Sequence, residues 1–238
     1  MNNNVIIDGL NAFRSIFPSE DALIEHVIEH TFFFEKNMVF EQARIVRNGI
    51  RTGEAIPVRY NSNSAFFLQH SVKTTTPSFK NRSEAISFTS KKDNHLFHRE
   101  TKIKICFDHD GNYAPKRAIQ FHTEHLVSSG QNSTITNYII AHIWDKTDNP
   151  MYFSLLWNYV LIPCHCAFLT DKRDDSDLFV KRIKELIKAI SIELFNPNRI
   201  MDWNQDVITQ SDMPSKEALK HAQVLIKEGK INFLSKRQ

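Results

Sequence analysis

The residues best suited to chemistry lie between positions 137 and 172 of the 238-residue chain. His142 stands near the end of an apolar run, Tyr138 to Ile143, and a polar loop follows this run. Asn158 then opens a second apolar run, which Pro163 closes. Because a neutral imidazole with a pKa of about 6.5 can take a proton from water at physiological pH, this pattern of strand, loop and strand indicates a histidine that activates water.

This stretch resembles the HNH, or ββα-metal, nucleases, and in particular their restriction-endonuclease-like members. In that family a His at the end of the first strand is the general base. An Asn at the start of the second strand orients the loop or binds the metal, and the following helix supplies a third residue. Here His142 and Asn158 are 16 residues apart, and Trp157 precedes Asn158. The resemblance implies an endonuclease of restriction or defence type that cleaves double-stranded DNA.

A metal site would complete such a nuclease, because a divalent ion relieves the charge of the phosphate. Mg²⁺, or Mn²⁺ in its place, prefers oxygen ligands. We therefore expect Asn158 to orient the loop or to bind the metal. The resemblance implies that Asp171 or His165 completes the metal site, and Lys172 is a candidate phosphate contact.

Two positions depart from the family pattern. Ala141 stands where family members commonly have an acid or a His, and Ala167 stands nine residues after Asn158, where the third His would fall. Either Asp171 takes the metal role, or the site is degenerate and the chain is a binding module without catalysis. A His in an apolar strand is also often a core residue that packs without any catalytic role.

The sequence Cys164-His165-Cys166 raises the alternative of a zinc site. Consecutive residues of one strand point to opposite faces, so in a strand these three side chains could not easily reach one ion. Three cysteines in total, with no C-x-x-C spacing, also argue against a disulfide framework.

Positive charge is concentrated in the middle of the chain, although the net charge is only +3. Between Lys73 and Arg117, ten Lys or Arg stand against five acids, an excess of 5. Such a run is often a solvated face, but it could also contact phosphates with salt-dependent affinity. The residues that we expect in this role are Lys102, Lys104, Lys116 and Arg117. Interleaved phenylalanines would suit a nucleic-acid or protein binding module, although core packing explains most of them.

A second alternative lies at the N-terminus, where Val5 to Asn11 is similar to the opening strand of PIN or NYN ribonucleases. In those enzymes a carboxylate at the strand end binds a metal, and Asp8 would take that role. The successive strands expected between residues 56 and 107 argue against their alternating fold.

The elements that must position these residues follow from periodicity and capping. Strands are expected at 56–60, 65–68, 85–89 and 102–107, and helices at about 20–34, 178–194 and 214–228. Together they predict one α+β domain over residues 1–238. The N-terminal and middle parts would be β-rich, the ββα-metal motif would occupy about 135–175, and the last third would be helical.

Localisation and assembly are weakly constrained. We find no signal peptide and no apolar run of the roughly 18 residues that a membrane span needs, so we expect a cytoplasmic protein with no membrane partner. A palindromic DNA target would imply a homodimer.

Overall fold

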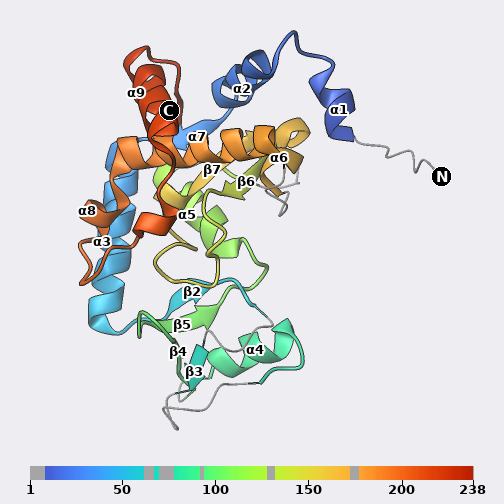
Figure 1. The fold of residues 1–238 in the computed structure, drawn as a ribbon. Helices are drawn as coiled ribbons and strands as arrows, with labels where there is room; N and C mark the ends of the chain where they lie inside the picture. Colours follow the sequence, from blue (N-terminus) through green and yellow to red (C-terminus); the bar gives the residue numbers. More distant parts are fainter. Residues whose placement is uncertain are drawn as a thin grey trace, which may run out of the picture.

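The computed structural model describes residues 9–61, 67–69, 78–91, 94–127, 132–171 and 177–237. In this part of the chain, helices stand before and between the strands of two four-stranded sheets (Figure 1). This arrangement confirms the predicted α+β class and the helical C-terminal third. Asp8 and Lys172 lie outside the described residues.

Sheet A has the strand order β6-β7-β1-β8. Its strands are β1 (Phe32–Phe34), β6 (Tyr138–His142), β7 (Tyr159–Pro163) and β8 (Asn232–Leu234). β7 pairs antiparallel with both β6 and β1, and β8 joins β1 in parallel. Because β7 lies inside the sheet between layers of helices, every residue of this strand is buried. The β6–β7 hairpin is thereby fixed to the main core.

Helix α7 (Leu178–Phe195) crosses β6 and β7 (Figure 1). Asp177 caps its N-terminus by accepting hydrogen bonds from the N–H groups of Phe179 and Val180. Apolar residues at helical spacing then bury one face of α7 against the sheet. The short helix α8 (Pro197–Met201) and α9 (Lys216–Lys227) complete the C-terminal third.

The N-terminal and middle helices surround the rest of the main core. Their bounds are α1 (Gly9–Arg14), α2 (Glu20–Glu29), α3 (Lys36–Thr52) and α5 (Tyr113–Thr123). A 3₁₀ turn, η3 (Cys164–Cys166), and the short α6 (Phe168–Asp171) follow β7. None of the helices in the described ranges is long and apolar enough to cross a membrane.

Sheet B is smaller and has the order β2-β5-β4-β3. Its strands are β2 (Ile56–Val58), β3 (Phe67–Gln69), β4 (Leu96–His98) and β5 (Lys104–Phe107). A separate small core joins this sheet to α4 (Arg82–Thr89). The N–H of Arg59, just after β2, donates to the Thr147 carbonyl at 2.8 Å. This bond attaches sheet B to the loop between β6 and β7.

Several predicted elements differ from those observed. The strand predicted at 85–89 is wrong, because this segment belongs to α4. Asn81 Oδ1 accepts the N–H of Glu84 at 3.0 Å, and Glu84 Oε2 accepts the N–H of Lys80 at 2.7 Å. Asn81 thus caps the helix and Glu84 reaches back to the residue before the cap, which starts a helix despite the strand-like composition that follows.

The N-terminal and middle parts therefore contain less strand than predicted. The helix predicted at 20–34 ends at Glu29, and residues 32–34 form β1. Helices α3 and α5 occupy part of the region expected to be β-rich. The strands predicted at 56–60 and 102–107 are confirmed as β2 and β5, and the C-terminal helices as α7 and α9.

Candidate active site

The β6–β7 hairpin gives His142 a fixed position. His142 is the last residue of β6 and pairs with Tyr159, the first residue of β7. The order of strand, loop, strand and short helix agrees with the order expected from the sequence. The loop between the strands, residues 143–158 (the hairpin loop), is largely buried and must be held by side chains, since it has little secondary structure of its own.

Asn158 organises the base of this loop. Its Oδ1 accepts the N–H of Trp144 at 2.9 Å, and its Nδ2 donates to the carbonyls of Tyr152 at 3.1 Å and Trp144 at 3.5 Å. The residue is fully buried. Both amide atoms of Asn158 are thus engaged by backbone groups of the hairpin loop.

A second buried amide supports the same loop from α3. Leu156 N–H donates to Gln42 Oε1 at 3.1 Å, and Gln42 Nε2 donates to the Ser154 carbonyl. Gln42 lies among apolar neighbours on the buried face of α3. No sequence motif singles Gln42 out, because an isolated Gln in an amphipathic helix is usually a surface residue.

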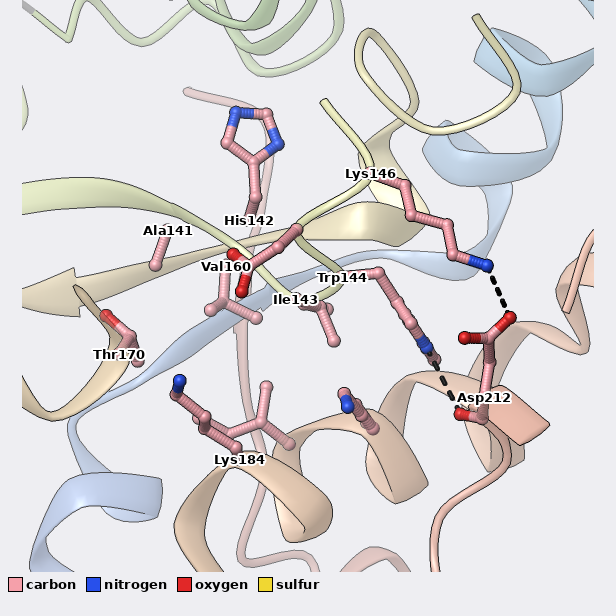
Figure 2. A pocket seen from close by; sticks show the side chains of 12 residues that line it. Ala141, His142, Ile143, Trp144, Lys146, Val160, Thr170, Lys184 and Asp212 are labelled. Carbon is pink, nitrogen blue, oxygen red and sulfur yellow. Dashed lines mark hydrogen bonds and ion pairs between the residues drawn. The ribbon is translucent and has the colours of Figure 1, made fainter. Parts of the chain in front are cut away.

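The imidazole of His142 lies on the face of β6 away from α6 and α7. Figure 2 shows it pointing away from Thr170 of α6 and Lys184 of α7. The ring stacks on Phe153, with centroids 5.5 Å apart and an interplanar angle of 15°, and meets the edge of Tyr159. His142 Nδ1 is enclosed and has no hydrogen-bond partner in the described part of the chain.

The other imidazole nitrogen faces two residues that sequence reasoning missed. His142 Nε2 lies 3.4 Å from Asn112 Oδ1, which also accepts a 2.6 Å hydrogen bond from an Nη of Arg59. Arg59 Nε donates to the Gly111 carbonyl at 3.1 Å. Three segments distant in sequence, after β2, before α5 and at the end of β6, therefore meet at His142.

The electrostatics of this cluster keep the imidazole neutral. Burial, followed by the positive charge of Arg59, lowers the pKa of His142 to about 3. Asn112 Oδ1 can only accept hydrogen bonds, so the contact with Nε2 favours the tautomer with its proton on Nε2. That tautomer leaves the lone pair on Nδ1, which makes Nδ1 the nitrogen able to accept a proton.

A tight turn before α5 holds Asn112 in place. One oxygen of Asp108 accepts the N–H groups of Asp110, Gly111 and Tyr113, and the other accepts that of Ala114 at 2.7 Å. Gly111 has a φ of 86°, in the left-handed region that glycine adopts without strain. Residues 108–112 thus form a carboxylate-centred turn that aims Asn112 at the hairpin.

The predicted metal ligands do not converge on His142. Asn158 is fully engaged, and His165 lies beside His26 of α2, with their Nε2 atoms 3.2 Å apart. Asp171 ends α6, which lies on the other face of β6, and its side chain is not among those described. Within the described residues, His142 belongs to no cluster of three metal-ligating side chains, so this neighbourhood does not fit a Mg²⁺ cage.

The predicted phosphate contacts are dispersed. Lys102 is exposed in the turn before β5, Lys104 is partly exposed, and Arg117 is exposed on α5. Lys116 Nζ pairs with Asp110 at 3.3 Å. The predicted residues thus lie on two separate elements.

A pocket of about 220 Å³ lies beside β6, and His142 is among the residues that line it, although its ring points away from Thr170 and Lys184 (Figure 2). Lys146, Lys184 and Lys188 line it, together with Asp145 and Asp212. Lys146 Nζ and Asp212 Oδ2 are 2.5 Å apart. Sequence reasoning missed this lysine-lined pocket, because its residues come from the hairpin loop, α7 and the segment before α9.

A family model described as "Uncharacterised protein PM1201" matches residues 34–236. This range contains His142, Asn112, Arg59 and Asn158. No curated protein and no solved structure matches the chain.

Proposed function

The chain belongs to the family described as "Uncharacterised protein PM1201", and we propose that it is a nuclease in which His142 accepts the proton of the attacking water. One observation carries the proposal. A neutral imidazole at the end of β6 and the Arg59 guanidinium share Asn112 Oδ1 as hydrogen-bond acceptor. This places an imidazole and a fixed positive charge together, as hydrolysis of a phosphodiester requires. Because the pKa of His142 is about 3 in the free protein, the proposal also requires that the negative phosphate, once bound beside Arg59, raises this pKa so that the ring can accept the proton.

In this reaction the water oxygen bonds to phosphorus as its proton passes to His142 Nδ1. The bond from phosphorus to the leaving sugar oxygen breaks, and that oxygen takes up a proton from the imidazolium or from solvent. Arg59 stabilises the negative charge that develops on the phosphate. Water must reach Nδ1, which Phe153 partly covers, so the proposal also requires the hairpin loop to move when substrate binds.

Two enclosed polar atoms support a functional role for this cluster. His142 Nδ1 and Tyr159 Oη are buried and without hydrogen-bond partners among the described residues, and the two rings are in contact. Buried polar groups are nearly always hydrogen-bonded, because an unpaired one costs about 1–3 kcal/mol. An unpaired buried group calls for an explanation, and a catalytic role would account for these two.

The metal dependence implied by the family resemblance remains a prediction. No step is assigned to Mg²⁺, because the described residues around His142 do not supply a set of oxygen ligands. Cleavage assays in chelator, in Mg²⁺ and in Mn²⁺ therefore form part of the test.

The proposal is tested by incubating the full chain with supercoiled plasmid, a labelled DNA duplex and a labelled RNA. We expect His142→Ala to reduce cutting by about 100-fold or more, the usual contribution of a general base. Arg59→Lys keeps the charge but loses the planar donor fork, and we expect roughly a tenfold loss. The matched control is His221→Ala, which removes an exposed histidine of α9 and should leave cutting unchanged.

Cutting that survives His142→Ala would contradict the proposal. So would the absence of cutting on every substrate and in every metal, provided that circular dichroism shows a folded protein. The RNA arm separates deoxyribonuclease from ribonuclease activity without affecting the assignment of the base.

A non-catalytic nucleic-acid binding module is the second candidate, and the lysine-lined pocket favours it. Lys146, Lys184 and Lys188 could hold a phosphate in this pocket. Nucleic-acid binding that weakens steeply with salt, without any cutting, would support this function over the nuclease. This binding should be lost in Lys184→Ala and unchanged in His142→Ala.

A further inference from the structure

A cluster of nitrogen and sulfur donors lies apart from the His142 site. It contains His26 of α2 with His165 and Cys166 of η3, the turn after β7. One ligand atom from each residue lies within 4.8 Å of the other two. The two histidine Nε2 atoms are 3.2 Å apart, although 139 positions separate the residues in sequence.

We propose that His26, His165 and Cys166 form a binding site for Zn²⁺ or a similar borderline-soft divalent metal. Imidazole and thiolate ligands select zinc over Mg²⁺, which prefers oxygen. In a tetrahedral site with zinc–nitrogen bonds of about 2.0 Å, two nitrogen ligands lie about 3.3 Å apart. The observed separation of 3.2 Å is already close to this value, so the metal could enter with little movement of either ring.

The structure also removes the objection drawn from the sequence. Residues 164–166 are not a strand but a 3₁₀ turn, in which successive side chains differ by about 120° instead of pointing to opposite faces. His165 is exposed and Cys166 is buried, yet a ligand atom of each lies within 4.8 Å of a ring nitrogen of His26. Cys164, at the start of the turn, is exposed and does not belong to the cluster.

Aromatic side chains enclose the cluster on one side. The ring of Phe17 lies 5.1 Å from that of His26, and the ring of Phe13 lies 6.4 Å from that of His165. An apolar surrounding restricts the access of water and strengthens ligand–metal attraction. Three protein ligands leave a fourth position for water or another ligand, as in zinc sites that are not closed.

A metal here would fasten the N-terminal helix α2 to the end of β7. Cys166 must lose its thiol proton as the sulfur–metal bond forms, so binding releases one proton to the buffer. Because the ligands come from distant segments, an unfolded chain would not present them together. Metal binding should therefore stabilise the folded protein.

The test is a titration of the chelator-treated full chain with Co²⁺, a coloured substitute for zinc. We expect one Co²⁺ to bind with a thiolate-to-cobalt charge-transfer band. Cys166→Ser should abolish that band, whereas the matched control Cys164→Ser should retain it. His165→Ala should weaken Co²⁺ binding by more than about 100-fold, beyond the usual effect of losing a residue that only supports a ligand.

Because His165 is exposed, its substitution also keeps the test informative if Cys166→Ser fails to fold. The proposal is overturned by a charge-transfer band that survives Cys166→Ser, by unchanged affinity in His165→Ala, or by a wild-type protein without the band. His142→Ala should bind Co²⁺ normally, so the readout is independent of any nuclease activity.

Discussion

Asn158 and Trp144 exchange two hydrogen bonds across the base of the hairpin loop. The N–H of Trp144 donates to Asn158 Oδ1 at 2.9 Å, and Asn158 Nδ2 donates back to the Trp144 carbonyl at 3.5 Å. Both residues are buried. Where β6 and β7 separate, the side chain of Asn158 takes the place of a backbone hydrogen-bond partner. It thereby fixes the backbone at Trp144, two residues after His142.

We predict that Asn158→Ala destabilises the protein by about 2–4 kcal/mol. The substitution leaves the buried N–H of Trp144 and the carbonyl of Tyr152 without their partner and creates a small cavity. Urea unfolding followed by circular dichroism measures the change. Asn204→Ala, at an exposed position, is the control and should change stability by less than about 0.5 kcal/mol. A similar loss in both variants would show that Asn158 has no special role in the loop.

That Asn158 contacts the loop between the two strands could be foreseen, because the contact is local. The pattern consists of nearby residues: a strand that ends in a histidine, a loop, and an asparagine at the start of the next strand. The partners of His142 could not be foreseen, because Arg59 and Asn112 reach it through the packing of sheet B and the turn before α5. Neither residue belongs to a motif, and each would normally be assigned to the surface.

The position of His165 shows the same limit. The family resemblance implied it, as an alternative to Asp171, as the residue that completes the metal site of the hairpin. Instead the 3₁₀ turn directs it to His26, a residue that periodicity placed only on a helix. The local choice between a strand and a 3₁₀ turn decided which residues meet, and composition does not distinguish the two over three residues.

The lowered pKa of His142 predicts that stability falls as the pH decreases. In the unfolded chain this imidazole takes up a proton near pH 6.5, but in the folded chain it does so only near pH 3. Between these values the unfolded state binds more protons, so acid favours unfolding. Between pH 7 and pH 5 we expect the free energy of unfolding to fall by about 1–2 kcal/mol more in wild type than in His142→Gln.

Comparison with His142→Gln is necessary because burial also lowers the pKa of His98 and His122. Those contributions are the same in both proteins and cancel in the difference. Urea midpoints at several pH values provide the measurement. Parallel pH profiles for the two proteins would mean that the pKa of His142 is not depressed.

We predict that Asp108→Ala disrupts the turn that aims Asn112. The carboxylate accepts four backbone N–H groups, three on one oxygen and one on the other. Loss of this carboxylate should lower the free energy of unfolding by about 3 kcal/mol, because the four N–H groups at the start of α5 and in the turn before it lose their acceptor. Asp110→Ala is the neighbouring control. It removes one exposed ion pair and one turn hydrogen bond, and we expect a loss of about 1 kcal/mol or less. Equal losses would argue against a central role for Asp108.

Gln42 offers a test of the hairpin loop that leaves the hairpin itself intact. Gln42→Leu preserves the volume of the side chain but removes the partner of the Leu156 N–H and of the Ser154 carbonyl. Both groups lie in the core, so we expect a loss of about 2 kcal/mol and faster hydrogen exchange at the Leu156 amide. Asn48→Leu, at an exposed position of the same helix, should change neither quantity by much. Unchanged exchange at Leu156 in Gln42→Leu would mean that Gln42 does not hold the hairpin loop.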